Sequence, residues 1–396
     1  MKRSKKSDWP IYILLWLLLA GVVFGLSKLE AAEEIPEPTP SPSPRAETAT
    51  TEVILPEESE LVGLWVPYFE LQAEDEEEFK ENFTAVVTKA KKAGVNALFV
   101  HVRAFCDALY ESEIYPTSHL IGGEQGAEYG FDPLKFMVEA SHEKGMEFHA
   151  WINPLRVAGK ETPGDFSTDS IYSRLKDSCP YYFIETESGI YLDPAYSYVR
   201  QIVAAGAEEI AENYEVDGIH FDDYFYPSDM GNQDELAYMS YLDMAVVPLP
   251  VEDWRIANIN TMVSETYRAI KKVDPEIKFG ISPQGNIGNN AALGADVEAW
   301  CAVPGYVDYI CPQIYFSFEN EALGFEECLD SWISMEKHEN LKIYIGLALY
   351  KVGTDSDGGT WSEDRSEILE QKKKVKKAKA DGVVYFDSSD IDILLD

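Results

Sequence analysis

Short apolar runs that alternate with stretches of helical periodicity constrain the fold of this chain more than any other feature. In the stretches at 79–90, 199–210 and 259–270, apolar residues recur three and four positions apart, which places them on one helical face. Strands that alternate with helices form a parallel sheet, and eight such units indicate a (β/α)8 TIM barrel, an α/β fold. The eight runs are Leu61–Val66, Val95–Val102, Met146–Ile152, Val216–Asp222, Ile277–Ser282, Val307–Tyr315, Leu341–Leu347 and Gly382–Phe386.

A doubly wound open sheet is the alternative architecture for the same alternation. Such sheets often bind nucleotides through a glycine-rich loop after a strand. No GxGxxG motif follows the first apolar run, and the chain contains no GxxxxGK[ST] motif. Nucleotide binding therefore lacks its main sequence support, and no cofactor is expected.

The connections between the runs differ in length on the two sides of the predicted barrel. Three strand-to-helix connections are long, at 103–131, 153–193 and 223–251, with 29, 41 and 29 residues. Five helix-to-strand connections are short and marked by Gly, Asn or Pro. Barrel enzymes carry their sites on the strand-to-helix loops, so the functional residues are expected at the C-terminal ends of the strands.

Polar residues gather where the second to sixth runs end. Alternate residues of a strand point the same way, so His101 and Arg103 are expected to share a side. Buried barrel strands normally consist of Val, Ile and Leu, and buried polar groups are costly unless they are hydrogen-bonded or used. A lone histidine is more often a core residue, but polar residues at the ends of five predicted strands together predict a functional site. Its other members are His149, Trp151, Asn153, His220, Asp222, Ser282, Gln284, Gln313 and Tyr315.

The segment 216–227 (VDGIHFDDYFYP) holds the strongest candidate for a catalytic carboxylate. Asp222 ends a predicted strand and points inward, where it can attack a sugar as nucleophile or activate water as base. Asp223 points the other way if the strand continues, and a loop-bracing role is equally expected. Aromatic side chains are either stacking platforms for sugar rings or packing residues; they are Trp65, Tyr68, Trp151, Tyr224, Phe225 and Tyr226.

The N-terminal region predicts a membrane anchor and a tether. Four basic residues precede Ile11–Leu26, a run of 16 residues without a charge, which indicates a transmembrane signal-anchor over 1–29 with the rest of the chain extracellular. A cleaved signal peptide is the alternative. The Pro-, Glu-, Ser- and Thr-rich segment 30–60 predicts an extended linker, and residues 61–396 predict one barrel.

Charge and cysteine content exclude several classes of protein. With 33 basic and 70 acidic residues, the net charge of −37 disfavours binding to nucleic acid. Five cysteines without a CxxC pair predict neither a disulfide framework nor a zinc site.

Six segments of the chain resemble a known family. GLWVPYFEL, NALFVHVRAFCDALYESEIYP, FHAWINPLR, DGIHFDDYFYP, ISPQGNIG and DYICPQIYF are similar to the glycosyl hydrolase-like 10 family, formerly DUF187. The resemblance implies a TIM-barrel glycosidase acting on a cell-wall glycan, such as peptidoglycan strands. The chain has no HxH or HExxH spacing, so no metal is expected. A more distant similarity to α-galactosidase and α-amylase barrels implies that Asp222 is the nucleophile.

The fifth and sixth strand ends carry amides where those distant relatives carry an acid, so the second catalytic carboxylate is expected elsewhere. Asp107 is the first candidate for the general acid, with Glu111 and Asp387 in reserve. The expected substrate contacts are Arg103, His149, Trp151, Asn153, His220, Asp223, Tyr224, Gln284, Asn286, Gln313 and Tyr315. Two alternatives stay open: a metal-dependent hydrolase that uses His101, His149, His220 and Asp222, and a non-catalytic wall-binding barrel.

Overall fold

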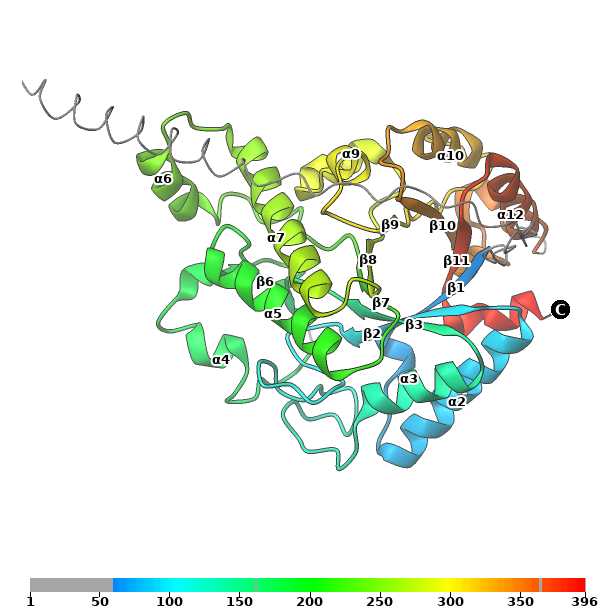
Figure 1. The fold of residues 1–396 in the computed structure, drawn as a ribbon, viewed down its shortest axis with the longest axis horizontal. Helices are drawn as coiled ribbons and strands as arrows, with labels where there is room; N and C mark the ends of the chain where they lie inside the picture. The colour runs from blue at the N-terminus through cyan, green and yellow to red at the C-terminus, as the bar shows by residue number, and fades with distance from the viewer. Residues whose placement is uncertain (1–59, 161, 363–364, 396) are drawn as a thin grey trace, which may run out of the picture. The chain divides into compact units, whose positions relative to one another are not determined.

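The computed structural model describes residues 60–160, 162–362 and 365–395 of the 396-residue chain (Figure 1). The predicted signal-anchor and nearly all of the predicted linker lie outside these residues. Within the described part, no helix is both long and apolar enough to cross a membrane.

Eight parallel strands form a closed barrel, which confirms the predicted (β/α)8 architecture and makes the open-sheet alternative wrong. Closure comes from pairing of the first and last strands, with Leu61 opposite Gly382, and these strands lie side by side in Figure 1. Around the barrel, the order is β1 (Leu61–Val66), β2 (Ala97–Arg103), β3 (Glu147–Ile152), β7 (Gly218–Phe221), β8 (Lys278–Ile281), β9 (Tyr309–Ile310), β10 (Lys342–Ala348) and β11 (Gly382–Phe386).

Each predicted apolar run overlaps one of these strands, but β9 is much shorter than its run. Pro312 follows two residues after the end of β9 and has no N–H to donate to a ladder. Pairing resumes only as isolated bridges from Gln313 to Gln284 and Gly346. The strand-like polar end at Gln313 is therefore held by its two neighbours rather than by a continuous ladder.

Helices between the strands bury the faces that the periodicity predicts. In α2, Phe79, Phe83, Val87 and Ala90 are buried, and the Asp75 side chain accepts a hydrogen bond from the backbone N–H of Glu78 at the N-terminus. The helices are α2 (Glu76–Lys92), α3 (Pro133–Glu143), α5 (Ser197–Asn213), α7 (Val251–Val273), α8 (Ile287–Asn290), α9 (Val297–Ala302), α10 (Phe325–Ser334), α11 (Ser356–Gly359) and α12 (Ser366–Ala378). Short 3-10 turns are η1 (Tyr68–Glu70), η3 (Ala291–Leu293), η4 (Leu349–Lys351) and η5 (Ser388–Leu394).

The three long connections all follow strands, as expected, and two of them contain structure of their own. The connection after β3 holds a small antiparallel sheet, which the sequence did not predict because its strands have only three or four residues. The connection after β7 carries α6 (Glu235–Met244). The small sheet consists of β4 (Arg156–Gly159), β5 (Phe183–Glu185) and β6 (Gly189–Leu192), with α4 (Ile171–Leu175) and η2 (Pro180–Tyr182) between β4 and β5.

At the opposite, N-terminal end of the barrel, a repeated side-chain bond joins neighbouring strands. The side chain of the residue just before a strand accepts a hydrogen bond from a backbone N–H of the preceding strand of the barrel at 2.7–2.9 Å. The acceptors are Asn96, Asp217, Asp308 and Asp381, and the donors are Val62, Phe148, Phe279 and Ile343. These bonds satisfy backbone groups at the barrel rim and hold the register of adjacent strands.

Removing one of these bonds is expected to cost stability and leave activity intact. Asp308 accepts from the Phe279 N–H at 2.7 Å and from Lys271 at 2.8 Å, so Asp308→Ala leaves a rim donor without its partner. We expect the free energy of unfolding in urea to fall by about 1–3 kcal/mol, with kcat unchanged. Glu339→Ala, at an exposed position, is the control. Equal stability of the two variants would contradict a structural role for the rim bonds.

Candidate active site

Asp222 lies where β7 ends and the chain turns into its long loop. The side chain is 2% exposed. One carboxylate oxygen, Oδ2, accepts from Trp151 Nε1 at 3.2 Å, and Oδ1 accepts from the Tyr224 N–H at 3.3 Å. Burial, together with the neighbouring charge of Asp223, raises the pKa of Asp222 to about 7. The carboxyl group therefore changes its protonation state near neutral pH.

Asp223 faces the same end of the barrel, because the strand ends at Phe221 and strand alternation no longer applies. Its Oδ1 accepts from Gln313 Nε2 at 3.2 Å. Burial raises the pKa of Asp223, while hydrogen bonding from the side chains of Gln313 and Gln284 opposes the rise. The amides that follow β8 and β9 thus act as donors to Asp223.

A stacked pair of rings orients the donor to Asp222. The indole of Trp151 lies on the imidazole of His101, with ring centroids 3.4 Å apart and planes 14° apart. His101 Nδ1 accepts from the Tyr68 N–H, and Nε2 contacts Asn153 Oδ1 at 3.2 Å. Burial and the nearby charge of Arg156 hold the pKa of His101 well below its usual value. A neutral, doubly hydrogen-bonded His101 therefore positions Trp151, and Asn153 positions His101.

Arg156 is a site residue that the sequence analysis missed. It opens β4, and its Nε donates to the Ala104 carbonyl at 2.9 Å. The guanidinium lies 4.7 Å from the ring centroid of Phe105, with Tyr224 and Tyr68 at 5.2 and 5.5 Å. Its charge lowers the pKa of both Asp222 and Asp223. A signal was present, because FHAWINPLR ends on this arginine, but strand parity does not extend into a loop.

Aromatic rings surround the two carboxylates. Their exposure distinguishes rings that can stack on a sugar from rings that pack in the core. Tyr224 is 49% exposed, and the Tyr315 ring is close to those of Phe386 and Tyr350, at 5.8 and 6.0 Å. Tyr68 is half-buried. In contrast, Trp65, Phe225 and Tyr226 are at most 2% exposed and belong to the hydrophobic core.

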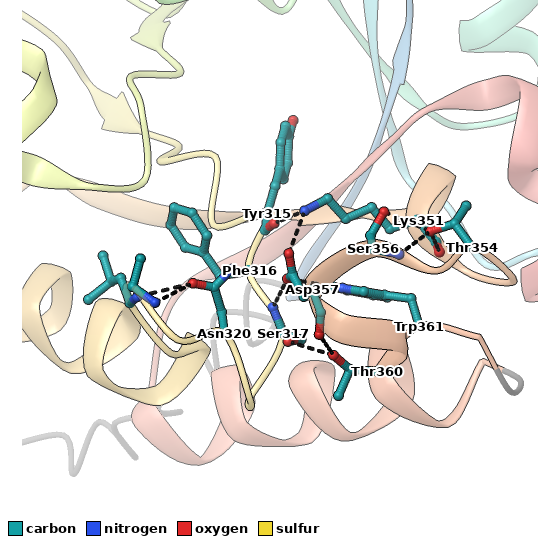
Figure 2. Close-up of polar contacts among 12 residues, drawn as sticks. Tyr315, Phe316, Ser317, Asn320, Lys351, Thr354, Ser356, Asp357, Thr360 and Trp361 are labelled. Carbon is teal, nitrogen blue, oxygen red and sulfur yellow. Dashed lines mark hydrogen bonds and ion pairs between the residues drawn. The ribbon is translucent and has the colours of Figure 1, made fainter.

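A polar network fixes the loops that carry Tyr315 and Tyr350 (Figure 2). Lys351 Nζ donates to the Tyr315 carbonyl at 2.7 Å and lies 3.5 Å from Asp357 Oδ1. Asp357 Oδ2 accepts from the Ser317 N–H at 2.8 Å and from Trp361 Nε1 at 3.2 Å. The loops after β9 and β10 are therefore braced against each other behind the aromatic side chains.

His149 and His220 lie inside the barrel rather than beside Asp222. Both are fully buried, and both contact the hydroxyl of Tyr309 through Nδ1, at 3.0 and 3.1 Å. His149 Nε2 faces Glu147 at the N-terminal end of β3, and His220 Nε2 contacts Ser282 Oγ at 2.9 Å. Their hydrogen bonds make them part of the polar interior of the barrel.

The histidines also fail to assemble with Asp222 as a ligand set. Among the residues that the structure describes, no three His, Cys, Asp or Glu side chains form a group that could hold a metal ion.

Arg103 is placed on the outside of the barrel, so the expectation that it shares a side with His101 was wrong. The register of β2 against β3 shifts between His101 and Arg103, which reverses the alternation. The guanidinium packs on the Tyr115 ring at 4.3 Å. A Cβ at Gly206 of α5 would lie 2.2 Å from Arg103 Nη1, which explains the gap in the apolar stripe of that helix.

Asp107, the first candidate for general acid, braces two loops. It is 1% exposed, and its Oδ2 contacts His119 Nδ1 at 2.8 Å and accepts from Gln125 Nε2 at 3.0 Å. The Oε1 of Gln125 accepts from the Ser167 N–H in the next long loop. Asp107 is not among the groups that shift the pKa of Asp222.

Among the described residues, three further candidates have no hydrogen bond to Asp222. Glu111 is exposed and borders a cavity between α3 and α5. The Asp387 carboxylate accepts from the Ser389 N–H at 2.9 Å, and Asn286 Oδ1 caps α8 by accepting from the Gly288 N–H at 3.0 Å. The structure thus brings together Trp151, Asn153, Asp222, Asp223, Tyr224, Gln284, Gln313 and Tyr315 from the expected set.

The sequence of this chain is similar to those of known proteins. The model of the glycosyl hydrolase-like 10 family matches residues 60–362. Glycosyl hydrolase YngK of Bacillus subtilis is 31% identical over 333 residues, which cover 79% of this chain and 64% of YngK. Glycosyl hydrolase DigH of Escherichia coli K12 is 32% identical over 292 residues, covering 67% of this chain and 65% of DigH. This chain thus spans less than two thirds of either relative.

Solved structures share the fold at low sequence identity. The glycoside hydrolase domain of PgaB (BpsB) from Bordetella bronchiseptica has a TM-score of 0.55 at 11% identity, over 84% of this chain and 94% of that domain. The catalytic domain of β-amylase from Paenibacillus polymyxa has a TM-score of 0.55 at 12% identity, over 83% of this chain and 92% of that domain. These likenesses concern the barrel itself.

Proposed function

Because this chain belongs to the glycosyl hydrolase-like 10 family, we propose that it is a glycoside hydrolase whose catalytic carboxylates are Asp222 and Asp223. The observation that carries the proposal is the adjacent pair at the C-terminal end of the barrel, in which Asp222 is buried and Asp223 is half-buried, with the pKa of Asp222 raised to about 7. Barrel enzymes place their reactive groups at this end, and a carboxyl group that titrates near neutrality suits proton transfer.

Asp222 is the group that we propose to exchange the proton. With a pKa of about 7, it exists in both protonation states near neutral pH and can accept a proton from attacking water. Trp151 and the Tyr224 N–H hold its two oxygens in place. We assign Asp222 the role of general base: its ionised form takes a proton from water as that water attacks the anomeric carbon. The glycosidic C–O bond breaks, and the leaving oxygen takes up a proton from solvent.

Asp223 is proposed to act electrostatically. Its Oδ1 is oriented by Gln313, and its charge lies beside Asp222. Glycoside hydrolysis passes through a transition state with positive charge on the sugar ring, which a fixed carboxylate stabilises. The exposed face of Tyr224 and the ring of Tyr315 are suited to stacking on the sugars.

We propose a cell-wall glycan strand, such as peptide-free peptidoglycan, as the substrate. The support is the resemblance of the site segments to the family, together with the aromatic side chains beside the carboxylates. Wild-type protein should release new reducing ends from such strands, with the double variant Asp222→Asn, Asp223→Asn as the blank. If wild type binds the strands but releases no more ends than the blank, the chain is a non-catalytic binding barrel instead.

The proposed location is the outer side of the cell membrane, with Ile11–Leu26 as a single-pass anchor. The support is the run of basic residues before this apolar segment. In cells stripped of their wall, protease added outside should degrade the barrel. In cells without protease, the full-length protein should be recovered with the membranes. Recovery of the full-length protein in the soluble fraction would contradict the anchor.

A further inference from the structure

Arg156 carries a positive charge that no acidic side chain neutralises by contact. Within the described part of the chain, it forms no ion pair, and Nε is its only nitrogen with a hydrogen bond. The residue is partly exposed, and its terminal nitrogens are not among the buried atoms that lack partners. The forked Nη edge of the guanidinium is therefore accessible.

The surroundings of Arg156 hold its guanidinium in one place. The Ala104 carbonyl accepts from Nε, and the rings of Phe105, Tyr68 and Tyr224 lie within 5.5 Å of the guanidinium carbon. Such contacts orient an arginine side chain at little further entropic cost when a ligand binds. The fork is thus preorganised before any substrate arrives.

The two nearby carboxylates do not serve as its partners. Asp222 bonds to Trp151 and the Tyr224 N–H, and Asp223 bonds to Gln313. Their effect on Arg156 acts through space, and the pKa of Asp222 at about 7 leaves it only partly charged at neutral pH. A positioned, uncompensated fork beside an acidic pair fits a planar anion, and carboxylates are bound bidentately by such forks.

We infer that Arg156 binds the carboxylate of an acidic sugar, so that the substrate is a glycan that bears carboxylates on its sugar units. This inference rests on the proposed function and narrows its substrate. Two kinds of unit supply the group: the lactyl ether of a muramic acid freed of its peptide, and a uronic acid. In a chain with a net charge of −37, a cation at the site also offsets the repulsion of such a substrate.

The test compares matched charged and neutral glycans. Peptide-free peptidoglycan strands are assayed beside the same strands after their carboxylates have been converted to amides, and polygalacturonate represents uronic acids. Wild type should cleave the charged strands with a kcat/KM about 10- to 100-fold above that for the amidated strands. Arg156→Gln should remove most of this ratio, and Arg156→Lys should retain part of it because the charge remains but the fork is lost.

The ratio of kcat/KM on charged strands to kcat/KM on amidated strands separates recognition of the carboxylate from a general effect of the substitution on the site. Arg156→Gln also raises the pKa of Asp222, but that change acts on both strand preparations alike and cancels in the ratio. Arg268→Gln is the matched control, since Arg268, among the described residues, bonds to the Ser264 carbonyl of its own helix α7. An unchanged ratio in Arg156→Gln would overturn the inference. A preference for polygalacturonate over the strands would assign the carboxylate to uronic acids.

Failure of the proposed function gives a different result. If wild type cleaves none of the three glycans, binding of charged and amidated strands to wild type and to Arg156→Gln is measured by calorimetry. Tighter binding of the charged strands that depends on Arg156 then supports the inference without hydrolysis. Equal binding of both preparations overturns it.

Discussion

Asp222→Asn is expected to lower kcat on a cleavable glycan by about 10³-fold, within the range that a single general acid–base group contributes. The amide keeps the shape of the side chain, and its one oxygen can still accept from either Trp151 Nε1 or the Tyr224 N–H, but it cannot accept a proton from water. Release of reducing ends under saturating substrate is the measurement. Activity within tenfold of wild type would show that another group transfers the proton.

Stability distinguishes this loss from misfolding. In the folded protein, the pKa of Asp222 is about 7, above its ordinary 3.8, so its contribution to stability is present below about pH 4 and lost as the pH rises to about 7. Asn stays neutral throughout this window. The free energy of unfolding of Asp222→Asn is therefore expected to exceed that of wild type by about 1–4 kcal/mol at pH 8, although the variant is inactive.

Asp107→Asn serves as the contrast, because the sequence analysis made Asp107 the first candidate for general acid. Its carboxylate is occupied by His119 and Gln125 in a brace between loops. The change should therefore lower the free energy of unfolding and leave the pH dependence of kcat close to that of wild type. A loss as large as that of Asp222→Asn, in a folded variant, would restore Asp107 to the catalytic pair.

Asp223→Asn is expected to produce the second large effect, a fall in kcat/KM of about 10²-fold. The negative charge of Asp223 raises the pKa of Asp222, so its removal lowers that pKa. The limb of the pH–rate profile that requires ionised Asp222 should move roughly one unit below its wild-type position near 7.

The measurement is kcat/KM from pH 4 to 9 for wild type and Asp223→Asn. Asp243→Asn is the control, since this exposed carboxylate lies on the same long loop and has no part in the pair. An acid limb that stays at the wild-type position in Asp223→Asn would mean that the two carboxyl groups are not coupled. The electrostatic role of Asp223 would then fail even if activity falls.

Much of the fold could be predicted because its signals are local. The apolar face of α2 follows from the spacing of Phe79, Phe83 and Val87, and each barrel strand overlaps a short apolar run. The small sheet at 156–192 escaped prediction, since strands of three or four residues carry too little periodicity to detect.

The candidate site was predicted only as far as strand geometry extends. Asp222, Trp151 and Gln313 were expected at the C-terminal end and are found there. His149 and His220 obey the same alternation, but they lie deeper in the barrel, bonded to Tyr309. Parity tells which way a side chain points and does not tell how far along the barrel axis it lies.

By itself, the sequence determined the architecture and the end of the barrel that carries the carboxylates, since both depend on residues close together in the chain. Only the tertiary structure decided which polar groups meet. Arg156 lies on another loop, and its charge acts on Asp222 and Asp223. Asp107 contacts His119 instead. Contacts between loops depend on the path of the backbone after each strand ends, where neither the period of a strand nor that of a helix applies.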